Sequence, residues 1–244
     1  MKSKKLKMER SDTYYNRYWR WITLSLFFTF HFSLLISCSQ DAYDKGEGRY
    51  SLMRGDFAEA NVNSSREVTS ITTDDGETLP LKTPFTAKWI SRPDTAYRCM
   101  LYYNKVKEAD GKAVAEVVSM GRVPCPRIIP LSVNVQYKDD PVKFESLWKS
   151  LSGNYMNLHL QLKTGQTEDS TAVQKLEFFS DQVIVYPGGR RTLPVLLHHD
   201  QGGVPEYYST QAYISIPTTD LDVDSVRFYL NTYAGLVIKT LPIQ

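Results

Sequence analysis

Residues 155–163 alternate apolar and polar side chains at every position, and this pattern constrains the fold more than any other feature. The apolar positions are Met156, Leu158, Leu160 and Leu162, and the polar ones between them are Asn157, His159, Gln161 and Lys163. A period of two is the period of a β-strand that buries one face and exposes the other. The stretch therefore predicts a strand whose apolar face packs against a core and whose polar face is exposed.

Short segments of the same kind recur along the rest of the chain, separated by turn residues. Asp74-Asp75-Gly76, Asp110-Gly111 and Pro187-Gly188-Gly189 lie between strand-like runs and predict turns. We expect the other strands at 57–62, 68–73, 77–81, 98–106, 113–123, 173–179, 183–186, 192–198, 206–216 and 225–239. Many short strands joined by tight turns predict an all-β fold.

Two segments depart from this pattern. Residues 142–151 carry apolar side chains at 144, 147, 148 and 151, which is helical spacing and predicts a short helix. Residues 82–96 are predicted to be mostly loop, because Pro80, Pro84 and Pro93 interrupt the pattern there.

Prolines also indicate where the chain divides. Pro124, Pro126 and Pro130 follow about five strand segments, enough for a small barrel. A cluster of prolines after a complete set of strands is typical of a domain boundary. We therefore predict a barrel domain over residues 50–130 and a β-sandwich domain over 131–244.

The N-terminal region has the layout of an export signal. A basic segment precedes the apolar run 22–36, which ends in Leu35-Ile36-Ser37-Cys38. The run is about 15 residues long and contains His31, whereas a transmembrane helix needs about 20 apolar residues. We predict a lipoprotein signal peptide at 1–37, cleaved before an acylated Cys38, and an acidic tether at 38–49. Either Met1 or Met8 can be the start.

Removal of this leader reverses the net charge. The full chain has 29 basic and 27 acidic residues, and residues 1–37 hold seven basic and two acidic ones, which leaves 22 basic and 25 acidic residues, a net charge of −3. No basic field remains to attract phosphate backbones, so nucleic acid is not an expected partner.

Two cysteines remain in addition to Cys38. In an exported protein Cys99 and Cys125 can form a disulfide. The alternative is two unpaired thiols that pack as small apolar groups.

The chain resembles the NigD-like lipoproteins of the Bacteroidetes. The resemblance rests on the Leu35–Cys38 signal, the Thr73–Gly76 turn, the strand Tyr97–Tyr103 and the closing strand Asp224–Asn231. It implies an N-terminal OB-like β-barrel, a C-terminal β-sandwich and no catalytic residues or cofactor. The family's name implies a loose link to bacteriocin production or immunity. Ser39 does not resemble an inner-membrane retention signal, and Asp41, Asp44 and Glu47 resemble the acidic stretch of surface lipoproteins of that group. We therefore expect an outer-membrane location, on either the periplasmic face or the cell surface.

Exported proteins of that group are often O-glycosylated at Asp-Ser/Thr followed by a small or apolar residue. Three triplets fit, and they make Thr95, Ser170 and Ser225 candidate glycosylation sites. The alternative for each is an ordinary turn or strand residue.

No group of residues in the sequence has the composition and spacing of a known catalytic or metal-binding motif. His198 and His199 are neighbours on a predicted strand, so they point to opposite faces and are not expected to bind one metal ion. Asp220, Asp222 and Asp224 resemble the start of a calcium loop but lack its glycine and final glutamate, so an acidic turn is expected. The chain also has no G-x-S-x-G, H-E-x-x-H or phosphate-loop motif.

Aromatic residues near the predicted long loop are the remaining candidates. Trp89, Tyr97 and Tyr102 can line a ligand surface of the barrel, and the alternative is packing against its core. We therefore predict a non-catalytic binding module, held to the envelope membrane by lipid, with a protein or glycan partner. The alternatives are a glycan-binding accessory lipoprotein and a bacteriocin-immunity-type protein.

Overall fold

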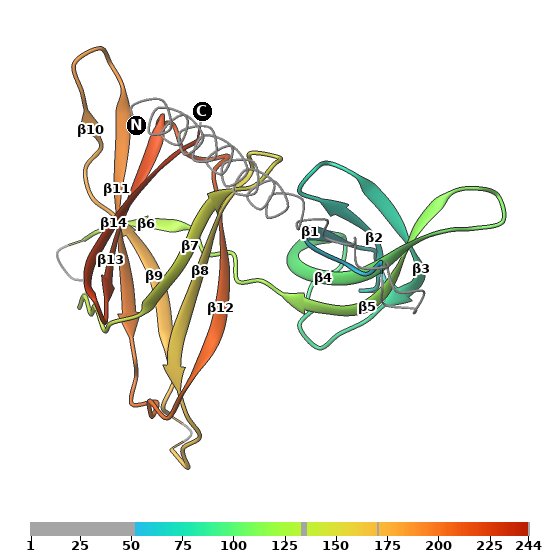
Figure 1. The fold of residues 1–244 in the computed structure, drawn as a ribbon, viewed down its shortest axis with the longest axis horizontal. Coiled ribbons are helices and arrows are strands. Elements are labelled where there is room, and N and C mark those ends of the chain that lie inside the picture. Colours follow the sequence, from blue (N-terminus) through green and yellow to red (C-terminus); the bar gives the residue numbers. More distant parts are fainter. Residues whose placement is uncertain (1–51, 133–135, 170, 244) are drawn as a thin grey trace, which may run out of the picture. The chain divides into compact units, whose positions relative to one another are not determined.

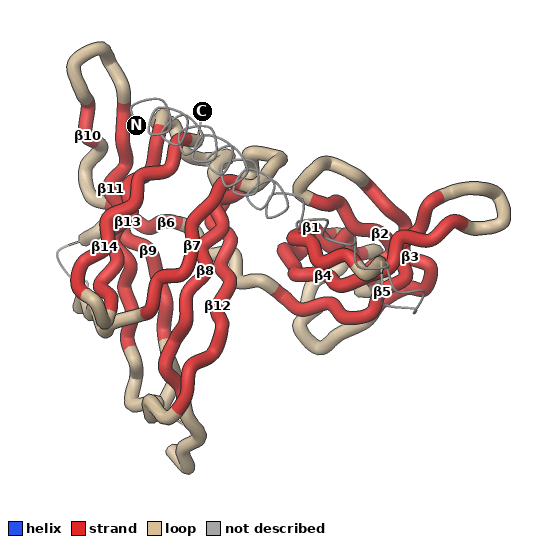
Figure 2. The backbone as a smooth tube through the Cα atoms, in the orientation of Figure 1, coloured by secondary structure: helices blue, strands red, loops and turns tan. Residues whose placement is uncertain are grey.

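The computed structural model describes residues 52–132, 136–169 and 171–243, and every regular element in them is a strand (Figure 2). The all-β prediction is therefore confirmed. The strands are β1 Arg54–Val62, β2 Val68–Thr73, β3 Thr78–Phe85, β4 Thr95–Lys107, β5 Ala113–Arg122, β6 Ile128–Pro130, β7 Lys143–Lys149, β8 Tyr155–Thr164, β9 Lys175–Ser180, β10 Ile184–Val185, β11 Arg191–Asp200, β12 Tyr208–Pro217, β13 Ser225–Thr232 and β14 Gly235–Pro242 (Figure 1).

The first five strands close into a barrel in the order β1-β2-β3-β5-β4, with β4 paired back to β1. A closed five-stranded barrel is the architecture that the resemblance implied. The Asp74–Gly76 turn joins β2 to β3 as predicted, and Gly76 adopts a φ of 85° that favours glycine. Alternate residues of β4, namely Cys99, Leu101 and Tyr103, are fully buried in the barrel core.

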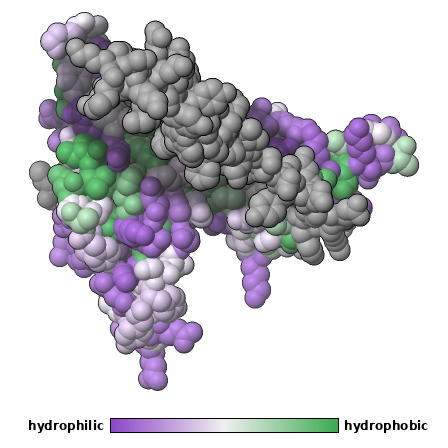
Figure 3. Space-filling view, viewed as in Figure 1, coloured by the Kyte–Doolittle hydropathy of each residue, from purple (hydrophilic) through white to green (hydrophobic). Residues whose placement is uncertain are grey.

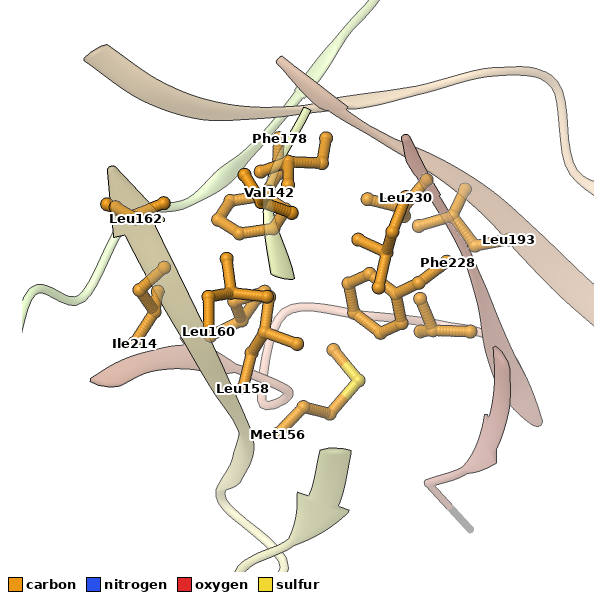
Figure 4. Close-up of a cluster of buried hydrophobic side chains, with 14 of the residues drawn as sticks. Val142, Met156, Leu158, Leu160, Leu162, Phe178, Leu193, Ile214, Phe228 and Leu230 are labelled. Carbon is orange, nitrogen blue, oxygen red and sulfur yellow. The ribbon is translucent and has the colours of Figure 1, made fainter. Parts of the chain in front are cut away.

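The remaining strands form two sheets that pack as a β-sandwich. One has the order β14-β13-β11-β9-β6, with β10 paired to β11, and the other has the order β12-β8-β7. Leu158 and Leu160 of β8 point toward Phe228 and Leu230 of β13 across the space between the sheets (Figure 4). The alternation in residues 155–163 therefore buries its apolar face as predicted.

The helix predicted over residues 142–151 is wrong, because this segment forms β7. A register shift between Phe144 and Ser146 inserts one extra residue into the strand. Phe144 and Leu147 therefore both pack against the sandwich core, although they are three residues apart. A β-bulge thus produced the spacing that we interpreted as helical.

The prediction that residues 82–96 are mostly loop needs correction at both ends. Strand β3 continues to Phe85 and includes Pro80 and Pro84, and β4 already begins at Thr95. Strand β3 tolerates its prolines because its pairing is sparse: β5 contributes only the pair Leu81↔Ala115, and the register with β2 is shifted. Few ladder hydrogen bonds are lost where pairing is incomplete.

The last predicted strand, residues 225–239, is in fact a hairpin. Strands β13 and β14 pair antiparallel from Ser225↔Pro242 to Thr232↔Gly235. Gly235 has a φ of 105°, which allows the tight reversal at that point. The sequence pattern missed the turn because Asn231–Ala234 contains no glycine or proline.

A short segment connects the barrel to the sandwich. Strand β5 ends at Arg122 and β6 begins at Ile128, so residues 123–127 form the connection. Residues Leu52–Gln244 form one compact unit that includes both sets of strands. Whether the barrel and the sandwich fold as separate domains, with a boundary near residue 130, stays a prediction.

Candidate binding site at the junction of barrel and sandwich

Arg98 is the central contact between the barrel and the sandwich. It lies on β4, on the side opposite Cys99 and Leu101, and is 5% exposed. Its guanidinium donates two hydrogen bonds to the Asp74 carboxylate, at 2.5 and 2.7 Å. It also donates to Ser215 Oγ at 3.1 Å and to Asn157 Oδ1 at 3.3 Å, both on the β12-β8-β7 sheet. The predicted turn after β2 thus supplies the acid that neutralises this buried cation.

Aromatic rings pack around the same contact. The Tyr155 ring lies 4.2 Å from the Arg98 guanidinium carbon, and the Tyr155 hydroxyl donates to Glu59 at 2.8 Å. Burial and the Glu59 carboxylate both raise the pKa of Tyr155. Phe57 of β1 meets Trp148 edge to face. Charged, polar and aromatic contacts occur together here, and these contacts fix the orientation of Arg98 and of the side chains around it.

Beside this junction lies a pocket of about 850 Å³. Its walls come from the end of the barrel, the connecting segment, and strands β8, β9 and β12 of the sandwich. The lining residues are Met100, Gly121, Arg122, Val123, Pro124, Cys125, Pro126, Leu162, Gln174, Leu176, Phe178, Gln211, Ala212, Tyr213 and Ile214. Leu162 and Ile214 lie at the edge of the core cluster in Figure 4, so the pocket reaches the sandwich core.

The pocket walls are mostly apolar and carry few polar groups. Arg122 is the single charged residue among the lining residues, and its guanidinium lies 5.7 Å from the Tyr97 ring. Gln211 contacts the His159 ring, which stacks on Tyr213. An apolar hollow with a small number of polar groups is the usual form of a ligand site.

The structure does not bring the three predicted aromatic residues together in one ligand surface. Trp89 is half-buried and packs with Phe85 and Tyr97 against the barrel core. The Tyr97 hydroxyl accepts hydrogen bonds from the backbone N–H groups of Ser91 and Arg92, at 3.1 and 2.9 Å. Tyr102 is exposed on the opposite side of β4. Trp89 and Tyr97 therefore hold the loop onto the barrel. This is the alternative considered from the sequence, in which these aromatic residues pack against the core of the barrel.

The disulfide considered from the sequence is absent, since Cys99 and Cys125 are both free. The Cys99 side chain points into the barrel and donates to the Ala58 carbonyl at 3.4 Å. Burial raises the pKa of the Cys99 thiol to about 12, so it acts as a small apolar group. Cys125 lies at the pocket wall, where partial desolvation raises its thiol pKa although the residue is exposed.

The glycosylation candidates differ in accessibility. Thr95 begins β4 and is partly exposed. Ser225 is 7% exposed and shares a 2.8 Å hydrogen bond with Thr192, so the folded chain offers a glycan little access there. Ser170 lies outside the described residues. Modification of Thr95 and Ser170 stays a prediction.

The histidine pair and the acidic turn have structural contacts. His198 Nδ1 accepts the Lys138 backbone N–H at 2.9 Å, and His199 Nδ1 donates to the Asp140 carbonyl at 2.9 Å. Asp224 accepts the backbone N–H of Arg191 at 2.6 Å. Within the part of the chain that the structure describes, no three His, Cys, Asp or Glu side chains are grouped to hold a metal ion.

The signal peptide, the tether and Cys38 all lie outside the described residues. Among residues 52–132, 136–169 and 171–243, no helix is long and apolar enough to cross a membrane. Lipidation of Cys38 therefore stays a prediction.

Sequence reasoning missed the pocket. Its lining residues come from five separate segments of the chain, and only the assembled sheets bring them together. One local signal was present, because Pro124 and Pro126 hold the connecting segment extended along the pocket. We interpreted these prolines as a boundary and not as part of a site.

Comparison with known proteins places this fold. No protein-family model matches the chain, and no curated protein matches it. A NigD-like immunity protein from Bacteroides caccae ATCC 43185 is similar in structure, with a TM-score of 0.59 and 21% identity, over 76% of this chain and 91% of that one. A protein of unknown function, DUF1344, from Bacteroides vulgatus ATCC 8482 has a TM-score of 0.57 and 16% identity, over 78% and 90%.

A third similar structure comes from Bacteroides fragilis NCTC 9343, and its own description proposes a lipoprotein. It has a TM-score of 0.55 and 10% identity, over 78% of this chain and 96% of that one. All three identities are below the level at which function can be transferred, so the likeness concerns the fold. The resemblance stated from the sequence is confirmed at that level: the chain has the barrel-and-sandwich fold of a NigD-like protein.

Proposed function

We propose that the mature chain is a lipid-anchored, non-catalytic binding protein of the bacterial outer membrane, and that the pocket beside the junction is its binding site. The observation that carries the proposal is the pocket itself, which is large, open to solvent and mostly apolar. Ligand pockets commonly combine such walls with a few polar groups.

The polar groups of the pocket suit binding better than catalysis. The raised pKa of Cys125 keeps its thiol protonated, and a thiol in that state is a weak nucleophile. Gln211 and Gln174 are amides, which donate and accept hydrogen bonds but do not transfer protons at neutral pH. The guanidinium of Arg122 can pair with an anionic group of a ligand.

The lipid anchor is tested by Cys38→Ser. We expect this variant to accumulate as an uncleaved precursor without label from a radioactive fatty acid, because the acyl acceptor is the Cys38 thiol. Cys125→Ser is the matched control and should be cleaved and labelled like the wild type. Fatty-acid label on the Cys38→Ser protein would contradict the proposal.

The binding site is tested by Gly121→Trp. A Cβ at Gly121 meets no atom within 4 Å and its φ is not in the left-handed region, so the indole can project into the pocket without strain. We expect the amount of envelope protein or glycan captured by the tagged, full-length chain to fall at least about tenfold. The free energy of unfolding should change by no more than about 0.5 kcal/mol, which is the usual effect of a surface substitution. The melting temperature should therefore stay close to that of the wild type.

Ser119→Trp is the control, because Ser119 is exposed on the same strand but is not part of the pocket lining. Equal capture by wild type, Gly121→Trp and Ser119→Trp would show that the pocket is not the binding site. Equal loss in both tryptophan variants would point to a non-specific effect and would also reject the pocket.

A further inference from the structure

Among the described residues, the two sheets of the sandwich end in strands β6, β14, β7 and β12, and β12 lacks the usual protection of an edge strand. Strand β7 carries charged residues and a bulge, β6 has only three residues, and β14 carries Lys239 and Pro242. Strand β12, in contrast, has no charged residue and no proline before Pro217, and its register with β8 is regular. Exposed edges are normally blocked by charge, proline, bulges or shortness, because unpaired edges accept further strands.

The backbone of β12 presents its free groups toward the pocket. The Ser215 N–H bonds to the Pro124 carbonyl at 3.0 Å, so Ser215 faces away from β8. Hydrogen-bonding direction alternates along a strand, so the backbone groups of Gln211 and Tyr213 also face outward. Both residues line the pocket, and β12 pairs with no other strand than β8 among the described residues. The connecting segment thus occupies one position of this edge and leaves the adjoining part open.

The charge of the pocket indicates what else the occupant carries. Arg122 is the one charged lining residue, and none of the ion pairs formed among the described residues includes it. An occupant with a carboxylate would complement it. A second copy of β12 would not, because Tyr208–Pro217 contains no acidic residue.

We propose that the occupant of the pocket is an extended segment of another protein that carries an acidic residue and adds as a strand to the free edge of β12. Its backbone pairs with Gln211 and Tyr213, its alternate apolar side chains enter the pocket, and its carboxylate pairs with Arg122. This inference rests on the proposed function and specifies its ligand class.

A synthetic peptide of about six residues, the usual length of a strand, tests the inference. The probe alternates valine with threonine, carries one central glutamate, and is labelled with fluorescein so that polarisation reports its binding to the full-length chain in detergent. A second probe is N-methylated at alternate amides, and a third carries glutamine in place of glutamate. N-methylation removes backbone donors and preserves the side chains.

The decisive comparison is Gln211→Pro against Gln211→Ala. Both remove the amide side chain, but only proline removes the outward backbone N–H. We expect Gln211→Pro to weaken binding of the glutamate probe at least about tenfold and Gln211→Ala to change it less than about threefold. The N-methylated probe should bind the wild type at least about tenfold more weakly than the unmethylated glutamate probe. This comparison uses only the wild-type chain, so it tests strand addition even if Gln211→Pro fails to fold.

Arg122→Gln should remove the preference for the glutamate probe over the glutamine probe, and Arg127→Gln, an exposed control outside the pocket, should preserve it. Equal affinity for the methylated and unmethylated probes would overturn strand addition, and so would no binding of any probe. A dimer of the chain that Gln211→Pro abolishes would make a second copy the occupant and would also overturn it. In each case the Gly121→Trp capture experiment still decides the proposed function separately.

Discussion

Arg98→Met is expected to lower the free energy of unfolding by about 3–5 kcal/mol. The substitution leaves the half-buried Asp74 carboxylate without its cation, and it leaves the buried Asn157 and Ser215 with fewer partners. Losing one member of a buried ion pair costs more than losing an exposed one, because the remaining charge stays desolvated. Urea unfolding followed by tryptophan fluorescence measures the change through the midpoint at constant slope.

Arg54→Met is the matched control for this prediction. Arg54 is a partly exposed arginine of the same barrel and forms ion pairs with Asp56 at 3.2 Å, Glu77 at 3.7 Å and Asp75 at 3.8 Å. Exposed ion pairs of this kind contribute up to about 1 kcal/mol, so the control should unfold close to the wild type. Equal losses for the two variants would show that Arg98 is not the central contact of the junction.

Phe228→Ala is expected to cost about 3–5 kcal/mol through the cavity it leaves. The Phe228 side chain is fully buried in the sandwich and meets the Phe178 ring edge to face, with ring centroids 6.2 Å apart (Figure 4). Phe178 also lines the pocket, so the variant should lose ligand binding as well as stability. Calorimetry of the full-length chain gives the change in stability directly.

Tyr229→Ala controls for position on the strand. Tyr229 follows Phe228 on β13 and points to the opposite face of the sheet, where it is only partly buried. We expect a loss well below that of Phe228→Ala. A similar loss of stability in both variants would mean that any substitution in strand β13 is destabilising, and that the cavity in the core is not the cause.

One exposed apolar area stays without an assignment. Leu236 and Ile238 of β14 are 64% and 50% exposed, and hydrophobic surface gathers over β13 and β14 in Figure 3. Isolated exposed apolar residues are common on soluble proteins, and nothing in the structure indicates what would cover this area. The proposed recognition surface is therefore the pocket, where charge and free backbone groups occur together.

Several elements were predictable because their signals are local. The alternation from Met156 to Leu162 specified which face of β8 is buried, and the Asp74–Gly76 turn specified a hairpin. Both depend on residues next to one another in the chain, whose side-chain direction and φ preference do not need the rest of the fold. The bulge in β7 and the reversal before Gly235 broke the local rule and were missed.

The sequence by itself determined most of the strands, the turns at Gly76, Gly111 and Gly188, and the net charge of −3 on residues 38–244. The tertiary structure alone decided that Arg98 would be buried against Asp74, Asn157 and Ser215, which lie 24, 59 and 117 residues away. It alone decided that Trp89 would pack on the barrel while an unprotected edge of β12 would border the pocket. The physical reason is that the periodicity of a strand specifies which of its faces is buried. The side-chain partners across the junction depend instead on how the barrel packs against the sheets of the sandwich.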